Sequence, residues 1–287
     1  MGHVSHSQFV SYSECNLKWK LRYIDKLGTF TGNIHTLFGT AMHTTIQTYL
    51  TEMYGKSIVA AESLDLNGML KTEMMKEFTT IKNNQEVLPC TQEEMVEFYQ
   101  DGLAILDHFR KHRGKYFMKK NYELVGIELP IFMNLQENVQ LKSYLDVVIR
   151  NKISGRITII DLKTSTRSWT DFQKKDFNKK SQLLLYKQFY SEKFDVPLDK
   201  ITVEFLILKR KIAKNSDFPI SRLQRFEPAN GKVSVNKTMK AFTEFREAIF
   251  DEKGNHKINR DYNASPGKAC KFCEFYDTEH CKWGKIL

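Results

Sequence analysis

Two stretches rich in isoleucine and valine, separated by a short polar turn, stand out in the middle of the chain. The first ends at Arg150, the second begins at Arg156, and Asn151–Gly155 lies between them. β-Branched residues on both sides of a Gly-bearing turn predict a β-hairpin over Leu141–Lys163. Because side chains alternate along a strand, one set is expected to face a core, namely Val147, Ile160 and Leu162.

Helical and extended patterns follow one another over the rest of the chain. Apolar residues three and four apart predict amphipathic helices, and short runs of β-branched and aromatic residues predict strands. Helices are expected over Ser7–Tyr23, Phe38–Leu50, Ala60–Lys82, Thr91–Lys119 and Val233–Phe250, with another beginning at Ser181. Further strands are expected over Tyr122–Met133, Ile201–Lys209 and Leu223–Phe226. This order predicts an α/β (α+β) fold with a mixed central sheet and a helical lobe.

The hairpin register brings three charged side chains to one face. If the turn centres between Ile153 and Ser154, Asp146 and Asp161 lie opposite each other, and Lys163 is two residues further along. Directly opposed residues have Cβ atoms roughly 5 Å apart. Two carboxylates this close repel each other unless a cation lies between them, and Mg²⁺ favours such oxygen ligands. The pattern predicts a divalent-metal site, with a surface salt-bridge cluster as the alternative.

Composition and charge favour a polyanionic partner. The chain has 287 residues, with 44 Lys and Arg against 34 Asp and Glu, which gives a net charge of +10. Contacts with phosphates release counterions, so a basic excess favours nucleic acid. No apolar run approaches the roughly 18 residues of a membrane span, and the start lacks the apolar region of a signal peptide. We therefore expect a cytoplasmic location and no membrane partner. The five cysteines are then reduced thiols or metal ligands, with Cys90 a free thiol.

The hairpin residues carry a family resemblance. Asp146, the intervening hairpin and the Asp161-x-Lys163 motif resemble the PD-(D/E)XK nuclease superfamily. The closer resemblance is to its RecB-like branch, which includes CRISPR-associated spacer-acquisition nucleases and phage exonucleases. This resemblance implies a restriction-endonuclease-like αβββαβ core, and the order of the predicted elements agrees with it.

The resemblance also implies a set of metal ligands. His43, in a Gly-x-x-x-His pattern, matches the metal-binding histidine of the family. It would hold one or two Mg²⁺ or Mn²⁺ ions together with Asp146, Asp161 and the backbone carbonyl of Leu162. Imidazole suits manganese better than magnesium. In the family an acidic residue near the first strand or helix can assist metal binding, but no motif fixes its position, so Glu128, on the strand before the hairpin, is expected to have a structural role.

Further residues are implied in catalysis and nucleic-acid binding. Lys163 would position the hydrolytic water, supported by Gln182 and Tyr186, which form the Gln-x-x-x-Tyr element of the family on one helix face. The polar stretch Thr164–Lys180 is expected to be a loop over the site. Its lysines and aromatics suit single-stranded DNA, which binds by backbone attraction and base stacking, and a solvated loop is the alternative. The residues expected to contact nucleic acid are Lys174, Lys175, Lys179, Lys180 and Tyr186.

Four cysteines form a second candidate site. Cys270-x-x-Cys273 presents two thiolates at a spacing that chelates one metal, and Cys281 follows after seven residues. Together with Cys15, they match the iron–sulfur site of RecB-like nucleases, where a [4Fe–4S] cluster would join the two ends of the chain. Zinc is the alternative, with Cys15 or His280 as the fourth ligand, and unligated thiols are a third interpretation.

These patterns together predict a metal-dependent DNA nuclease. An exonuclease acting on single-stranded ends in recombination, repair or replication is favoured over an endonuclease, with a helicase or recombination protein as a partner. The chain is expected to comprise an N-terminal helical segment (1–34), a helical lobe (35–120), a nuclease core (121–230) and a C-terminal helix with the cysteine cluster (231–287). The alternatives are a non-catalytic DNA-binding or recruitment subunit on the same fold and a metal-clasped protein-interaction module.

Overall fold

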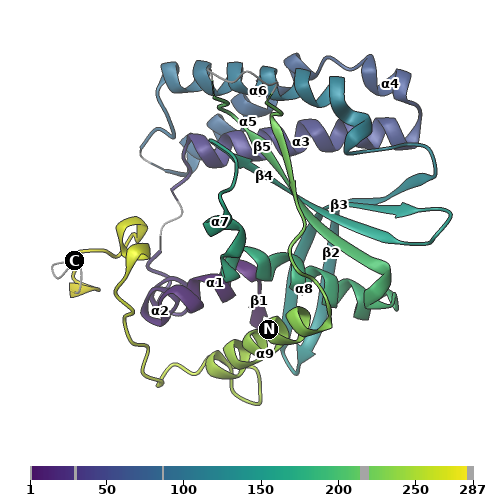
Figure 1. Ribbon diagram of the computed structural model, residues 1–287. Helices are drawn as coiled ribbons and strands as arrows, with labels where there is room; N and C mark the ends of the chain where they lie inside the picture. Colours follow the sequence, from purple (N-terminus) through teal and green to yellow (C-terminus); the bar gives the residue numbers. More distant parts are fainter. Residues whose placement is uncertain (1, 29–30, 86, 214–219, 283–287) are drawn as a thin grey trace.

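A mixed six-stranded β-sheet with helices on both faces forms the body of the protein (Figure 1). The computed structural model describes residues 2–28, 31–85, 87–213 and 220–282. After the helices α3 to α6 come the three strands β2 to β4, then the helices α7 and α8 and the strand β5. The predicted α/β class and the αβββαβ order are therefore confirmed.

The sheet is organised around strand β3, which pairs with three other strands. The strands are β1 (Gly2–Val4), β2 (Tyr122–Gln136), β3 (Val139–Asn151), β4 (Ile157–Ser165), β5 (Ile201–Lys209) and β6 (Leu223–Phe226). Strand β3 pairs antiparallel with β2 and β4, and its first residues pair in parallel with β1. Strand β4 then pairs in parallel with β5, and β5 pairs antiparallel with β6. The hairpin thus lies inside the sheet, covered by helices on both sides.

The β3–β4 hairpin has the register that its predicted turn requires. Val147 pairs with Ile160, and both side chains join Leu162 in the hydrophobic core under the lobe. The turn is closed by the side chain of Asn151, which accepts hydrogen bonds from two backbone N–H groups, and by Gly155 at φ +67°. A glycine adopts this left-handed conformation without the steric cost of a side chain. The local sequence therefore fixes which residues face each other further along the arms.

Helices α3 to α6 form the lobe on one face of the sheet (Figure 1). They are α3 (Ile34–Gly55), α4 (Ile58–Glu62), α5 (Leu66–Asn84) and α6 (Gln92–His112). The single helix predicted over 60–82 is wrong, because α4 ends at Glu62 and Asp65 begins α5 by accepting a hydrogen bond from Gly68 N. The helix predicted to reach Lys119 ends at His112, where a 3₁₀ turn follows (Arg113–Lys115).

Four further helices pack on the opposite face of the sheet (Figure 1). They are α1 (His6–Glu14), α2 (Asn16–Tyr23), α8 (Phe177–Phe194) and α9 (Lys232–Ile249). The helix predicted over 7–23 is two helices that meet at Cys15, whose Sγ accepts a hydrogen bond from Lys18 N at the start of α2. The loop predicted over 164–180 is wrong in its second half. Thr170 and Asp176 cap α7 (Asp171–Lys175) and α8 there.

Both hydrophobic clusters pack against the same sheet, so the lobe on one face and the helices on the other are joined through it. Asp101 of α6 adds ion pairs of 2.9 Å to Arg210 and 3.0 Å to Lys211, just beyond β5. The division of the chain at residues 34, 120 and 230 stays a prediction. Within the described ranges, no helix is long and apolar enough to cross a bilayer.

Candidate active site

The two aspartates predicted to face each other meet at the end of the hairpin. They occupy the position next to the Val147–Ile160 pair, Asp146 on β3 and Asp161 on β4. Asp146 Oδ2 accepts a hydrogen bond of 2.8 Å from the backbone N–H of Leu162. Lys163 Nζ lies 2.7 Å from Asp161 Oδ2. The hairpin therefore places both carboxylates and the ammonium group within one site.

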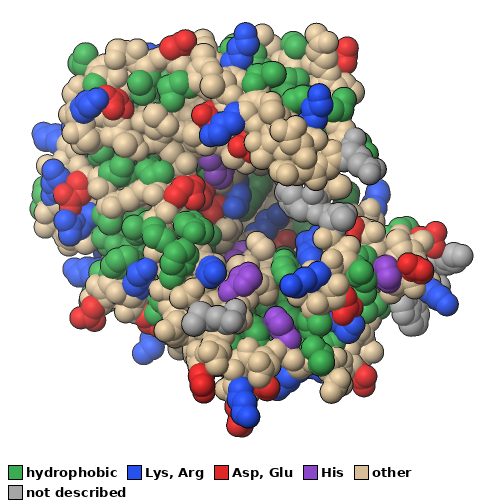
Figure 2. Space-filling model, turned by 180° about the vertical axis from the view of Figure 1, so that it is seen from behind, with side chains coloured by type: hydrophobic (Ala, Val, Ile, Leu, Met, Phe, Trp, Pro, Cys, Tyr) green, Lys and Arg blue, Asp and Glu red, His purple; other side chains and the backbone are tan. Residues whose placement is uncertain are grey.

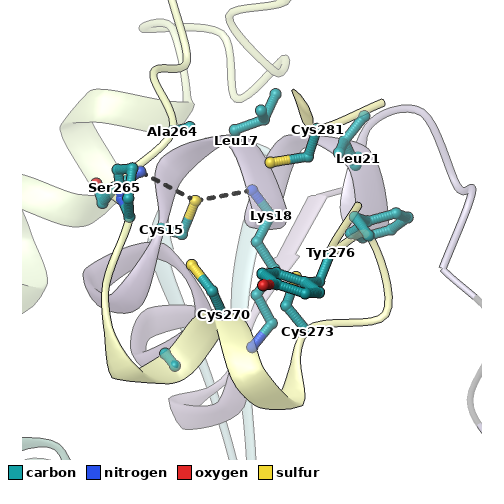
Figure 3. A pocket seen from close by; sticks show the side chains of 13 residues that line it. Cys15, Leu17, Lys18, Leu21, Ala264, Ser265, Cys270, Cys273, Tyr276 and Cys281 are labelled. Atoms are coloured by element: carbon teal, nitrogen blue, oxygen red, sulfur yellow. Dashed lines mark hydrogen bonds between the residues drawn. The ribbon is translucent and has the colours of Figure 1, made fainter. Parts of the chain in front are cut away.

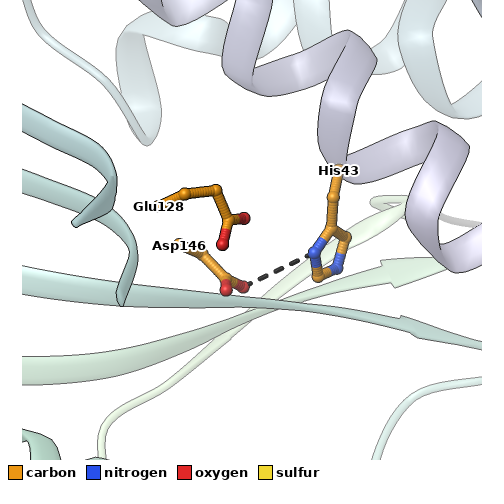
Figure 4. Close-up of side chains that lie close together, drawn as sticks. All are labelled: His43, Glu128 and Asp146. Carbon is orange, nitrogen blue, oxygen red and sulfur yellow. Dashed lines mark ion pairs between the residues drawn. The ribbon is translucent and has the colours of Figure 1, made fainter. Parts of the chain in front are cut away.

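His43 reaches this site from helix α3 (Figure 4). Its Nδ1 lies 3.6 Å from Asp146 Oδ2. A Cβ at Gly39 would lie 3.4 Å from Thr164 Oγ1, already in van der Waals contact with the end of β4, so a side chain larger than alanine has little room there. Residues four apart lie on the same helix face. The Gly-x-x-x-His spacing therefore lets α3 come close to the strand and directs His43 toward Asp146.

Glu128 is a site residue that the sequence analysis assigned to a structural role. Its carboxylate points toward Asp146 and His43 in Figure 4. Gln47 of α3 holds it by donating a hydrogen bond of 2.6 Å to Glu128 Oε1, and the same amide nitrogen lies 3.2 Å from the Asp146 carbonyl. Glu128 has φ +46°, a left-handed conformation that is rare for a side-chain-bearing residue inside a strand. Such strain is typical of functional sites. Glu128 comes beside Asp146 through the β2–β3 register, in which its neighbours Ile127 and Leu129 pair with Val147 and Leu145.

Burial and like charge shift the pKa values of the site. Burial raises the pKa of Asp146 to about 6 and that of Asp161 to about 6, although attraction to Lys163 opposes both shifts. Burial lowers the pKa of His43 to about 4, and the Lys163 charge acts in the same direction. Burial alone would lower the pKa of Lys163, but the Asp161 and Asp146 carboxylates hold it above its ordinary value. Lys163 alone therefore does not fully offset the burial of the two carboxylates, and a further cation would favour their charged forms.

The donor atoms of the site fit a divalent cation. His43, Glu128 and Asp146 offer ligand atoms that all lie within 4.8 Å of one another. An imidazole with carboxylates suits Mn²⁺, and carboxylate oxygens suit Mg²⁺. Among the residues that the structure describes, no other three His, Cys, Asp or Glu side chains meet this spacing. Asp161, which is paired with Lys163, lies beside this group of three ligands.

The Gln-x-x-x-Tyr element lies against the same end of the hairpin. Gln182 and Tyr186, one turn apart on α8, are joined by a hydrogen bond of 2.9 Å from the amide to the phenol oxygen. Burial raises the pKa of Tyr186 well above its ordinary value, and the charge of Asp161 adds to this effect. The phenol is therefore neutral at neutral pH, and its own O–H stays available as a donor.

The order and spacing of these residues agree with a comparison of the whole sequence. A sequence profile of the PD-(D/E)XK nuclease superfamily matches residues 3–278. The chain belongs to this superfamily. A solved structure titled "Crystal structure of SSO0001" is 12% identical and covers 97% of this chain and 96% of that one. Its TM-score of 0.31 is too low to support an argument, and no curated protein matches the chain.

Membership in the PD-(D/E)XK superfamily implies a nuclease, and nucleases of this superfamily use divalent metals. The group of His43, Glu128 and Asp146 is a candidate site for such a metal. The assignments to the RecB-like branch and to a CRISPR-associated type stay predictions.

The four lysines predicted to bind nucleic acid lie in different surroundings in this PD-(D/E)XK chain. Lys174, on α7, pairs with Asp171 at 3.3 Å. Lys179, near the start of α8, lines a hollow together with Lys163 and Gln182. Lys175 and Lys180 do not line that hollow.

The four candidate cysteine ligands line one pocket between helix α2 and the C-terminal segment (Figure 3). Cys15 lies between α1 and α2, whereas Cys270, Cys273 and Cys281 come from the C-terminal segment. Cys15 Sγ accepts backbone hydrogen bonds of 3.4 Å from α2 and from Ser265. Burial raises the pKa of the Cys273 thiol, and Cys15 and Cys281 are close enough to contribute. Cys90 lies apart from them in the core of the lobe.

Proposed function

We propose that the protein is a metal-dependent DNA nuclease, and that it acts as an exonuclease on single-stranded ends. The observation that carries the proposal is the convergence of His43, Asp146, Asp161 and Lys163 at the end of one hairpin. The net charge of +10 supports a nucleic-acid substrate. A role in recombination, repair or replication, with a helicase as a partner, stays a prediction.

The metal would be Mg²⁺ or Mn²⁺, held by His43, Asp146, Asp161 and the Leu162 carbonyl. Glu128 joins this set because its carboxylate lies within 4.8 Å of the ligand atoms of His43 and Asp146. A divalent cation at such a site lowers the pKa of a bound water and neutralises charge on the phosphate. Gln47 would keep Glu128 aimed at the site through its 2.6 Å hydrogen bond.

Lys163 would act as a hydrogen-bond donor rather than as a base. Its raised pKa keeps the ammonium charged at neutral pH, and Asp161 at 2.7 Å fixes its position. From there it would orient the attacking water and stabilise negative charge that develops on the phosphate. Tyr186 accepts the hydrogen bond from Gln182, so its O–H would be free to donate to a phosphate oxygen.

The test is degradation of end-labelled single-stranded DNA with Mg²⁺ or Mn²⁺, compared between the wild type and Lys163→Ala. Losing a donor aimed at the developing charge costs about 100-fold or more in rate. Wild-type activity in Lys163→Ala would refute the assignment. A circular single-stranded substrate of the same sequence separates exonuclease from endonuclease action. DNA binding in EDTA without cleavage in Mn²⁺ would favour the non-catalytic binding subunit.

The cysteine pocket supports a [4Fe–4S] cluster more than a zinc ion. Tetrahedral zinc, with bonds of about 2.3 Å, needs sulfurs roughly 4 Å apart. All four thiols belong to the described residues, and no three of their sulfurs lie within 4.8 Å of one another, as the ligand atoms of His43, Glu128 and Asp146 do. Backbone N–H groups also point at Cys15 and Cys270 sulfurs, an arrangement that tunes iron–sulfur clusters. A brown colour and bound iron in the purified protein are expected, whereas stoichiometric zinc without iron would refute the cluster.

A further inference from the structure

Two hollows meet at the end of β4, one on each side of Lys163. The first, the acidic hollow, is lined by His43, Glu128 and Asp146. The second, the Lys179 hollow, has a volume of about 410 Å³ and is lined by α1, the end of β4 and the start of α8. Lys163 and Thr164 line both hollows. Figure 2 shows the molecule deeply hollowed below the lobe, with histidine, acidic, and Lys or Arg side chains inside.

The acidic side chains of the Lys179 hollow are already engaged. Glu14 pairs with Lys18 at 3.0 Å, and Asp176 caps α8 by accepting a hydrogen bond of 2.9 Å from the Asn178 backbone N–H. Both carboxylates therefore already have partners, which weakens their ability to bind a cation inside the hollow.

Lys179 is the unpaired cation of this hollow. It takes part in no ion pair with the described residues, whereas Lys163 is held by Asp161 at 2.7 Å. Lys179 Nζ lies 5.3 Å from the centre of the Trp169 ring, a cation–π contact that orients the side chain. The hollow therefore presents a positioned positive charge next to the catalytic lysine, without a negative partner.

The remaining walls suit a phosphate better than a base. Trp169 is only 7% exposed and Phe205 is fully buried, so neither ring offers a free face for base stacking. His6 Nε2 lies 3.1 Å from the Asn178 carbonyl and 3.0 Å from Ser181 Oγ, which fixes this wall. A cavity with a positioned cation and no exposed stacking platform is the kind of surface that binds the sugar-phosphate backbone.

We infer that the Lys179 hollow binds a backbone phosphate of single-stranded nucleic acid, next to the phosphodiester held at Lys163 and the acidic hollow. This inference rests on the proposed nuclease function. Because Lys163 and Thr164 line both hollows, a strand that crosses them places successive phosphates on the two sides of the catalytic lysine. The inference also distinguishes Lys179 from lysines outside both hollows, such as the exposed Lys237 of α9.

The experiment measures binding of a fluorescent oligothymidylate in Ca²⁺ at several salt concentrations. Each phosphate contact to a single strand contributes about 0.7 to the slope of log K against log salt. We expect Lys179→Ala to reduce the slope by about this amount and Lys179→Arg to preserve it. Lys237→Ala, an equal change of charge at an exposed lysine of α9 that lines neither hollow, is expected to leave the slope unchanged.

Two outcomes would overturn the inference: an unchanged slope in Lys179→Ala, or equal losses in Lys179→Ala and Lys237→Ala. Cleavage by the wild type is measured separately in Mn²⁺. A protein that cleaves DNA but binds without dependence on Lys179 would refute only the hollow. A protein that binds through Lys179 but never cleaves would refute only the nuclease function.

Discussion

The buried carboxylates of the site are held at a cost in stability. Asp146 and Asp161 both have pKa values raised to about 6, mainly because burial disfavours their charged forms. A carboxyl group of this kind contributes stability below its unfolded pKa near 3.8, and that contribution is lost as the pH rises through 6. His43, whose pKa is lowered to about 4, acts in the opposite sense and loses its contribution as the pH falls from 6.5 toward 4. The metal-free site is therefore strained at neutral pH.

Asp146→Asn tests this electrostatic cost. The amide keeps an oxygen for the Leu162 N–H but carries no charge. In EDTA, we expect its free energy of unfolding to equal that of the wild type near pH 4 and to exceed it by about 2 kcal/mol at neutral pH. Urea unfolding at the two pH values measures this. Added Mn²⁺ should reverse the order, because it stabilises only a form that binds it. A variant less stable than the wild type at neutral pH in EDTA would contradict the argument.

Glu128 carries a second kind of strain, in the backbone. Its φ of +46° is easily adopted by glycine and costs about 1 kcal/mol or more for other residues. We expect the free energy of unfolding of Glu128→Gly to exceed that of Glu128→Ala by about 1 kcal/mol. Inside a strand the alanine variant is usually the more stable of the two. Both variants should bind Mn²⁺ about tenfold more weakly by calorimetry, since each loses the carboxylate. Wild-type Mn²⁺ affinity in either variant would exclude Glu128 as a ligand.

At the scale of residues, local patterns predicted only part of the site. The positions of Asp146, Asp161 and Lys163 follow from the hairpin register, which the turn at Asn151–Gly155 fixes locally. Glu128 was missed because its place depends on how β2 pairs with β3 and on a left-handed residue within the strand. The sequence pattern indicates neither feature.

The lobe helix α3 depends on a lysine far along the chain. Lys119 Nζ donates hydrogen bonds of 2.5 Å to the Met53 carbonyl and 2.7 Å to the Lys56 carbonyl, at the C-terminal end of α3. These carbonyls lack helical partners, and the negative end of the helix dipole attracts a cation. Since α3 carries His43, this cap supports the metal site from a distance.

Lys119→Met removes these donors and keeps the apolar stem. We expect the free energy of unfolding to fall by about 2 kcal/mol, since hydrogen bonds from a charged donor are lost. Lys120→Met, a change at the next residue, is the matched control and should alter stability by less than about 0.5 kcal/mol. Urea unfolding of the wild type and of both variants measures these free energies. Equal stability of the two variants would refute the role assigned to Lys119.

At the scale of elements, the errors follow from caps and short contacts. The break between α4 and α5 depends on Asp65 capping Gly68 N, a competition that the apolar spacing over 60–82 does not reveal. Strand β1 has three residues, too few for an alternating pattern, and exists only because β3 accepts it as a neighbour. Long periodic segments such as α9 need no such context, and their prediction was close to the observed bounds.

The whole molecule has a sheet with a hydrophobic cluster on each face, and the C-terminal segment adds little to either cluster. Tyr262 joins the core, but Phe275 is buried outside both clusters, in the cysteine pocket. An ion pair of 2.7 Å between Arg22 and Glu274 also ties this segment to α2. The segment beyond Tyr262 is therefore held mainly by the cysteine site and its surroundings.

Cys15→Ser tests whether the cysteine site is the clasp of the chain ends. We expect bound iron and absorption near 400 nm, an approximate value for thiolate-bound iron, to be lost. Limited proteolysis should then cut the C-terminal segment much faster than in the wild type, because little else holds it. The sheet and its two clusters should stay folded, as circular dichroism would show, since their packing does not involve Cys15. Cys90→Ser is the matched control. It alters a thiol in the lobe core that is not a candidate cluster ligand, and the protein should keep its iron. Wild-type resistance to proteolysis in an iron-free Cys15→Ser protein would mean that packing around Phe275 and the Arg22–Glu274 pair is enough to join the ends.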